Sequence, residues 1–233
     1  MKEETAKPVN SVLLEGPVCS CSVHHVFEDT SAAVLAKLEI CTAARRKDKN
    51  GVHFENVILH RAIVLADGEN AEKIRSLSQK TIDLTGDISK LDYVRLEGSL
   101  AANKSGQHYV NVPKEGISFL TRMSFKNDIR LQGKVLETTN NSAYAGAILE
   151  CEGPDKKSVI VPIQIYSKDN PRKYSDLCSG KVRKGDVLSV KGPLISRIYS
   201  NGENNVFQCN VNVNSYENLN KKKSQKKQTN MGM

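Results

Sequence analysis

The sequence predicts an all-β fold built from two similar units, each with five short antiparallel strands. Apolar and polar residues alternate with a period of two through most of the chain, which is the pattern of half-buried strands. Two stretches with the same Asn and Gly spacing begin at Asn10 and Asn127 and indicate an internal repeat. Glycine-containing turns lie between apolar runs in both copies, as expected of β-hairpins.

The first strand carries the repeat most clearly. In each copy three alternating apolar residues surround a glycine: Val12, Leu14, Gly16 and Val18 in the first, Ile129, Leu131, Gly133 and Val135 in the second. A glycine here suits a strand that bends sharply, as strands of a small barrel must. The fourth strands end on Gly98 and Gly192, which favours the same architecture.

The middle strands repeat less exactly. Second strands are expected at 34–40 and 147–151, and third strands at 53–64 and 158–166. Between its third and fourth strands the first copy has an insert with the pattern of a short helix over Asn70 to Leu77, whereas the second copy has a shorter insert. Strands of this number, with a variable insert at this place, are expected of the OB barrel, and a β-sandwich is the alternative.

Asn201-Gly202 predicts the last hairpin, because a two-residue type I′ turn requires positive φ at both central positions. Pairing outward from this turn places four residues on the core face, namely Leu194, Ile198, Phe207 and Cys209. Arg197 and Tyr199 fall on the outer face. A cation and an aromatic ring two residues apart on a protruding ribbon indicate a binding surface.

The corresponding hairpin of the first copy requires a different loop. Its apolar pattern is kept by a three-residue loop over 104–106, with Gly106 in the left-handed conformation. Leu100 then lies opposite Val110 in the core, and Ala101 faces Tyr109 on the outside. Tyr109 is thus the expected counterpart of Tyr199.

These patterns define the expected domains. They are a disordered leader at 1–9, a first OB-fold domain at 10–120, a second at 125–219 and a disordered basic tail at 220–233. The net charge of +8 is concentrated late in the chain: residues 1–120 carry −1, residues 121–219 carry +4 and the tail carries +5. This distribution indicates a polyanionic partner.

Composition also limits the compartment. No apolar run approaches the roughly 18 residues that a membrane span needs, and the polar start MKEETAKPVN carries no export signal. We therefore expect a cytoplasmic protein whose six cysteines are reduced thiols.

Two segments resemble the bacterial and phage single-stranded DNA-binding protein (SSB) family. Residues 41–77 resemble its pattern of an Arg-Arg loop with Lys-Asp and Gly, a strand closing on His-Arg, and a helix. Residues 181–219 resemble its Lys-Gly strand, its bend, its Arg-x-Tyr hairpin and its final strand. Each copy thus keeps a different half of the pattern.

The resemblance implies OB folds that bind single-stranded DNA, usually four in one assembly. A chain with two such units is then expected to form a homodimer. Two features depart from the family: the chain ends in KKKSQKKQTNMGM and not in an acidic segment, and Lys47 stands where the family commonly has Trp. Partner recruitment by an acidic tip is therefore not expected, and base stacking must either be supplied by Tyr and Phe or be weaker.

Single-strand binding needs cations for phosphates and aromatic faces for bases. The residues expected to meet these needs are Arg45, Arg46, Lys47, Lys49, Phe54, Arg61, Tyr109, Arg130, Lys134, Lys156, Lys157, Arg197 and Tyr199. We expect the second unit to contribute mainly through the hairpin with Arg197 and Tyr199, and the first through its loop at 45–49. For each, the alternative is an ordinary solvated surface.

No catalytic constellation is apparent, so an enzyme is not expected. Cys19, Cys21, His24 and His25 are close in sequence, but their spacing is not that of a zinc finger, and neither a metal nor a cofactor is expected. The sequence thus favours a protein that coats single-stranded DNA in replication, recombination, or mobile-element or phage DNA metabolism. The alternatives are a protein-binding adaptor, such as a primosome or recombination accessory, and a single-stranded RNA-binding protein.

Overall fold

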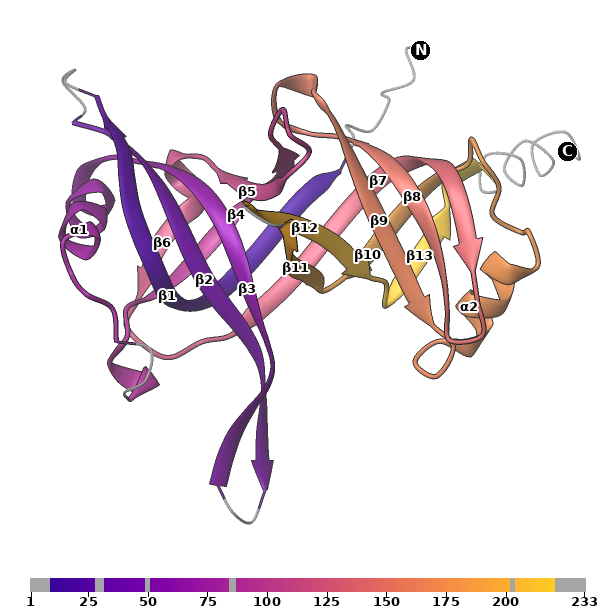
Figure 1. Ribbon diagram of the computed structural model, residues 1–233, viewed down its shortest axis with the longest axis horizontal. Helices are drawn as coiled ribbons and strands as arrows, with labels where there is room; N and C mark the ends of the chain where they lie inside the picture. The colour runs from indigo at the N-terminus through magenta and orange to yellow at the C-terminus, as the bar shows by residue number, and fades with distance from the viewer. Residues whose placement is uncertain (1–8, 28–31, 49–50, 84–86, 202–203, 221–233) are drawn as a thin grey trace, which may run out of the picture. The chain divides into compact units, whose positions relative to one another are not determined.

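The computed structural model describes residues 9–27, 32–48, 51–83, 87–201 and 204–220 (Figure 1). Nearly all of the predicted leader and tail, and Gly202 of the predicted turn, lie outside these residues. The two described residues that were assigned to the leader and the tail are both hydrogen bonded. The Val9 carbonyl accepts the Gln132 amide at 2.6 Å, and the Asn220 amide donates to the Asn218 side chain at 3.1 Å.

The chain divides into two compact units that are not consecutive in sequence. The N-terminal unit comprises Val12–Asp128 together with Ser196–Gln208. The C-terminal unit comprises Ile129–Ile195 and the described residues 9–11 and 209–220. Most of the last hairpin, which the sequence assigned to the second domain, therefore belongs to the N-terminal unit.

The N-terminal unit contains a closed five-stranded barrel. Its strands are β1 (Asn10–Val26), β2 (Val34–Asp48), β3 (Gly51–Ala66), β4 (Tyr93–Ala102) and β5 (His108–Val112). β1 pairs with β2, β2 with β3, β3 in parallel with β5, β5 with β4, and β4 with β1, so the pairing returns to its start. A short strand, β6 (Ile117–Leu120), extends β4 on its other side. This order of strands is that of the predicted OB barrel.

The second copy repeats this pairing, although Ser196–Gln208 of its last hairpin belongs to the N-terminal unit. Its strands are β7 (Lys126–Asn140), β8 (Tyr144–Glu152), β9 (Ser158–Tyr166), β10 (Val187–Gly192), β11 (Leu194–Asn201), β12 (Asn204–Asn212) and β13 (Ser215–Asn218). β7 pairs with β8 and β10, β8 with β9, and β9 in parallel with β12. Pro193 separates β10 from β11, where the first copy has the single strand β4, because proline has no amide to donate to a sheet.

The two copies share one register. Val12 lies opposite Gly98 in the first, and Ile129 lies opposite Gly192 in the second. A Cβ on Gly98 would lie 2.2 Å from the Asn111 carbonyl oxygen, and one on Gly192 would lie 1.9 Å from that of Asn212. Only glycine allows this close approach of two backbones, which explains why the fourth-strand glycine recurs.

The predicted apolar alternation forms the two cores. All of the residues that the sequence placed on core faces of the first strands are buried, and so are Leu38, Ile40, Leu149 and Ile163. The loop after β4 also matches the prediction: Gly106 has φ +76°, and Leu100 pairs with Val110. The side chain of Ala101, however, is only 4% exposed and not on the outside, since β4 is covered on both faces here.

Two further predictions need correction. Leu194, Phe207 and Cys209 are buried as expected, but Ile198 is 49% exposed and belongs to no core. The second copy also has a helix that the sequence reading omitted, α2 (Pro171–Cys178). Asn170 caps it by accepting the Lys173 amide at 3.3 Å, and proline follows at the first helical position, which together are a typical helix start.

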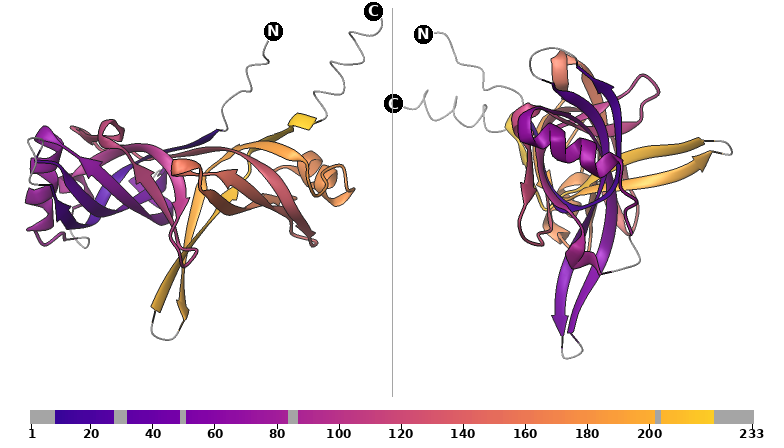
Figure 2. Two further views of the ribbon diagram at one scale, coloured as in Figure 1. Left: turned by 90° about the horizontal axis from the view of Figure 1, so that it is seen from above. Right: turned by 90° about the vertical axis from the view of Figure 1, so that its left-hand side faces the viewer.

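The helix predicted over 70–77 is confirmed as α1 (Gly68–Ser78). Ala71, Ile74 and Leu77 recur at helical spacing and are buried, so this apolar stripe packs on the barrel of the N-terminal unit. Figure 2 shows the helix lying across one end of that barrel. Three single turns, η1 (Ile88–Lys90), η2 (Lys114–Gly116) and η3 (Pro154–Lys156), complete the described secondary structure.

Candidate nucleic-acid interface

A two-stranded arm extends from the barrel of the N-terminal unit (Figures 1 and 2). Here β2 and β3 continue as a ladder that pairs Ala44 with Glu55 and ends with Asp48 opposite Gly51. A bulge separates the arm from the barrel, with Asn56 at φ +53°. Bulges bend a strand and redirect the residues on their far side. The arm is thus set off from the barrel wall.

The arm carries most of the basic loop that the sequence singled out. Arg45 lies opposite Phe54, Arg46 opposite His53 and Lys47 opposite Val52 in the backbone ladder. The sequence placed these residues in a loop, whereas the structure places them on paired strands. Lys49 and the side chains of the arm lie outside the described part of the chain. The backbone therefore gathers three cations and one aromatic residue on a narrow ribbon.

Arg61, at the base of β3, has partners within its own unit. Its guanidinium lies 3.3 Å from Glu39 Oε1 and its Cζ lies 4.1 Å from the centre of the Phe207 ring. Lys37 also approaches Glu39, with 3.3 Å between Nζ and Oε1. The Glu39 carboxylate is thus shared by the two cations Lys37 and Arg61. These three side chains together carry a net charge of about +1 on this surface.

His60 joins the hairpin of β11 and β12 to the barrel. Its Nε2 lies 2.8 Å from Thr42 Oγ1 on β2, and its Nδ1 lies 3.0 Å from Ser196 Oγ on β11. Asn127 Nδ2 donates to the same Thr42 oxygen at 3.2 Å. Burial lowers the pKa of His60 to about 3, which keeps the imidazole neutral at physiological pH. Residues of four strands, β2, β3, β7 and β11, therefore meet around the buried His60.

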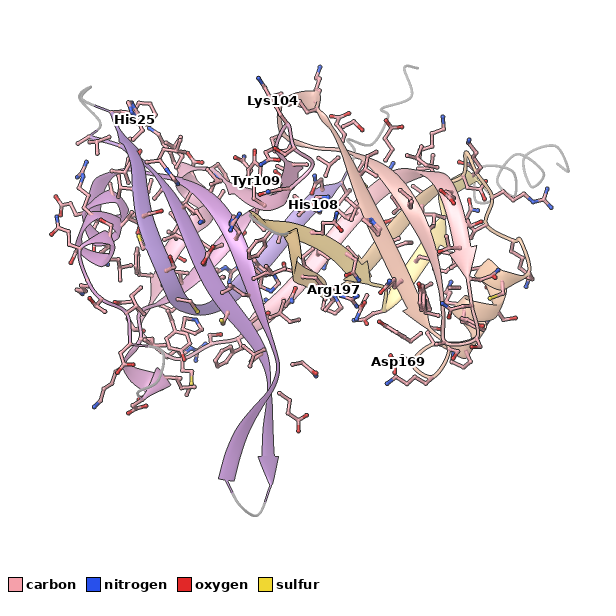
Figure 3. All side chains as sticks on the ribbon, in the orientation of Figure 1. His25, Lys104, His108, Tyr109, Asp169 and Arg197 are labelled. Atoms are coloured by element: carbon pink, nitrogen blue, oxygen red, sulfur yellow. The ribbon has the colours of Figure 1, made fainter. Side chains whose placement is uncertain are left out.

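The hairpin faces two ways. Phe207 is 2% exposed beneath the Arg61 guanidinium, whereas Arg197 on β11 is exposed (Figure 3). Tyr199 lies on the same strand, and its side chain is outside the described residues. Tyr109 is half-buried on β5, directly opposite Ala101, and the exposed Lys104 lies in the adjoining loop. The N-terminal unit thus brings together both hairpins that the sequence assigned to separate domains.

In the C-terminal unit the predicted cations lie on one strand and one turn. Arg130 and Lys134 are exposed on β7, where Lys134 pairs with Val187 of β10 and with Glu150 of β8. Lys156 and Lys157 are exposed at the turn η3, and Lys156 has φ +60°. The structure keeps all four accessible to a polyanion.

The structure adds an aromatic pair that the sequence reading missed. Tyr144 begins β8, Tyr166 ends β9, and the two are cross-strand partners with ring centres 6.2 Å apart. Both are half-buried, and the exposed Lys168 lies two residues after Tyr166. An apolar face bordered by a cation is the combination that a base and its phosphate require. Their pairing depends on the register of β8 and β9, which the sequence did not fix.

Metal and membrane sites are not evident in the described ranges. These residues contain no group of three or more His, Cys, Asp and Glu side chains able to hold a metal ion. Cys19 instead contacts Cys41, and His24 and His25 are exposed. Among the helices that the structure describes, none is long and apolar enough to span a bilayer.

Comparison with solved structures shows the OB-type fold of single-stranded DNA-binding proteins. The chain is similar to the wild-type single-stranded DNA-binding protein of Thermus aquaticus, with a TM-score of 0.59 and 18% identity, over 91% of this chain and 94% of that one. A deletion mutant of the same Thermus protein matches with a TM-score of 0.56, 18% identity and the same coverage. No protein-family model and no curated protein sequence matches the chain.

Proposed function

We propose that this protein binds single-stranded DNA without sequence preference, through two tandem OB-fold units. One observation carries the proposal: the fold matches a single-stranded DNA-binding protein over nearly the whole of both chains. The surface chemistry supports it, because exposed cations and partly exposed aromatic rings occur on strands of both units. The protein acts as a coat and not as an enzyme.

Phosphates are bound by the cations of both units. In the C-terminal unit these are Arg130, Lys134, Lys156 and Lys157, and in the N-terminal unit they are Arg197, the arm residues Arg45, Arg46 and Lys47, and Lys49. Each neutralised phosphate releases counterions. The logarithm of the binding constant therefore falls with the logarithm of the salt concentration, with a slope of about −0.7 for each phosphate contact. Arg61 contributes less than these, because Glu39 already balances part of its charge.

Bases stack on tyrosine and phenylalanine. Tyr166 with Tyr144 forms the platform of the C-terminal unit, and Tyr109, Tyr199 and Phe54 serve the N-terminal unit. A stacked base contributes about 1–3 kcal/mol and every base has a π-face, so such binding tolerates any sequence. The asymmetry expected from the sequence is thereby revised, since Arg197 and most of its hairpin belong to the N-terminal unit.

The assembly and setting belong to the same proposal. Two OB units per chain form four in a homodimer, which protects single-stranded DNA during replication, recombination, or mobile-element or phage DNA metabolism in the cytoplasm. The domain boundaries in this proposal are 10–120 and 125–219, except that Ser196–Gln208 of the last hairpin belongs with the first unit.

Binding of the full chain to fluorescent oligo(dT), measured by anisotropy at 50 and 200 mM salt, tests the proposal. We expect saturable binding that weakens steeply between the two conditions. The absence of a complex at the lower salt would refute DNA binding and favour a protein-binding adaptor. Tighter binding to a matched oligo(U) RNA would identify a single-stranded RNA-binding protein.

A further inference from the structure

Two cysteine side chains of the N-terminal unit lie in direct contact. Cys19 Sγ on β1 is 3.0 Å from Cys41 Sγ on β2, and neither thiol is fully buried. A disulfide bond is about 2.05 Å long, so the two sulfur atoms need to approach by only about 1 Å to form one. The pair is therefore placed for covalent bond formation.

The strand geometry explains this contact. A Cβ on Gly16 would lie 1.8 Å from the Cys41 carbonyl oxygen, so β1 can pass this close to β2 only with glycine at this position. A bulge then interrupts the ladder between Val18 and Ser20, which leaves Cys19 without a cross-strand partner in the register. The extra residue of a bulge turns its side chain away from the regular alternation. The close approach at Gly16 and the bulge at Cys19 together direct the Cys19 side chain toward Cys41.

The two thiols differ in acidity. Cys19 donates a hydrogen bond to Cys41, which raises the pKa of Cys19 and lowers that of Cys41. Cys41 therefore holds the negative charge when one proton leaves the pair, and the thiolate is the form that attacks a disulfide. This difference favours Cys41 as the attacking residue and Cys19 as the resolving one in any thiol–disulfide exchange at the pair.

The thiols are reached through an apolar cavity of about 280 Å³. Pro17, Val57, Leu91 and Phe125 line it together with both cysteines. Its walls are mostly apolar carbon, so a small molecule can approach Cys41 without passing a charged side chain of the lining. Cys21 has a different environment, because its Sγ donates to the Ile74 carbonyl at 3.5 Å.

We propose that Cys19 and Cys41 form a reversible dithiol site that is oxidised by low-molecular-weight disulfides. The Cys41 thiolate attacks one sulfur of the oxidant, forms a mixed disulfide and releases one thiol. Cys19 then loses its proton and attacks Cys41 Sγ, which forms the internal disulfide and releases the second thiol. The oxidant is reduced by two electrons and gives two thiols, and the two cysteines are oxidised by the same two electrons.

The test uses the full chain with Cys178→Ser, which removes the cysteine that the structure shows as exposed. The folded protein is treated with oxidised glutathione, free thiols are alkylated, and a non-reducing tryptic digest is analysed by mass spectrometry. Trypsin cuts after Lys37 and Arg45, so Cys41 lies alone on peptide 38–45. We expect this peptide to be linked by a disulfide to the peptide that contains Cys19. The linked pair should weigh two hydrogen atoms less than the sum of the two reduced peptides.

Two variants separate the roles. Cys19→Ser should stop the reaction at a glutathione adduct on Cys41, whereas the matched control Cys21→Ser should form the internal disulfide as the parent does. Alkylated Cys19 and Cys41 in the oxidised parent would overturn the proposal, and so would a lasting glutathione adduct on Cys41. A cross-link lost in Cys21→Ser and kept in Cys19→Ser would assign the pair to Cys21 and overturn it as well.

Discussion

Replacement of Tyr166 by alanine removes one ring of the cross-strand aromatic pair that Tyr144 and Tyr166 form between β8 and β9. If a base stacks on this ring, its loss costs about 1–3 kcal/mol, so the dissociation constant for oligo(dT) should rise about 5- to 150-fold. The salt dependence should stay unchanged, because the ring neutralises no phosphate. Anisotropy titrations at several ionic strengths measure both quantities.

The same substitution also has a structural cost that must be kept apart from binding. The edge-on contact with Tyr144 contributes about 0.5–1.5 kcal/mol beyond buried area. That is small against a typical stability of about 5–15 kcal/mol, so the variant should remain folded. Tyr166→Phe is the matched control: it keeps the ring and loses only the hydroxyl that donates to Gln164 Oε1 at 3.4 Å. Equal affinity of Tyr166→Ala and the parent would refute stacking at this site.

Three other outcomes are expected from the described contacts. Lys134→Ala should reduce the slope of log affinity against log salt concentration by about 0.7. The control Lys181→Ala should leave this slope unchanged, because Lys181 already binds Asp176 at 2.8 Å. Equal slopes for the two variants would show that Lys134 does not contact the DNA. The pKa of His60 is about 3 in the folded protein and about 6.5 in the unfolded chain. Between these two pH values only the unfolded chain binds a proton at His60. The free energy of unfolding should therefore fall by up to about 1.4 kcal/mol for each pH unit from pH 6.5 down to pH 3. Urea titrations check this, and an unchanged pH profile in His60→Gln would contradict it. Gly192→Ala should lower thermal stability far more than Gly180→Ala. An added Cβ meets the Asn212 carbonyl at 1.9 Å in the first, whereas in the second it meets open space and the cost is only that of alanine at φ +69°. Similar melting temperatures would argue against the close approach at Gly192.

Periodicity predicted most of the fold because each copy encloses its own core. Residues such as Leu14 and Leu131 must face inward wherever their strands run, and their alternation records this directly. The helix α2 was missed because its apolar face is small: Leu177 is its one buried residue. Its start was nevertheless encoded in Asn170 and Pro171, so attention to capping would have found it.

The candidate interface was less predictable, because contacts between distant residues decide it. The sequence identifies Arg61 as a possible phosphate ligand by its charge. Nothing in the neighbouring sequence indicates that its guanidinium pairs with Glu39 and lies over the Phe207 ring. The Tyr144 and Tyr166 pair requires a register that alternation alone leaves open. Ile198 was misplaced for the opposite reason: alternation continues along a strand after the core beneath it has ended.

The discontinuity of the N-terminal unit has a consequence for how the chain folds. Ser196 and Phe207, which contact His60 and Arg61, come more than 130 residues after them. Contacts this far apart must wait for late synthesis and slow the search for the native state. A ribosome-bound chain that ends before residue 196 can close the first barrel but leaves His60 without its Ser196 partner. Hydrogen exchange of the β3 amides should therefore slow further once the last hairpin has been made, because that hairpin adds contacts to a barrel that is already closed.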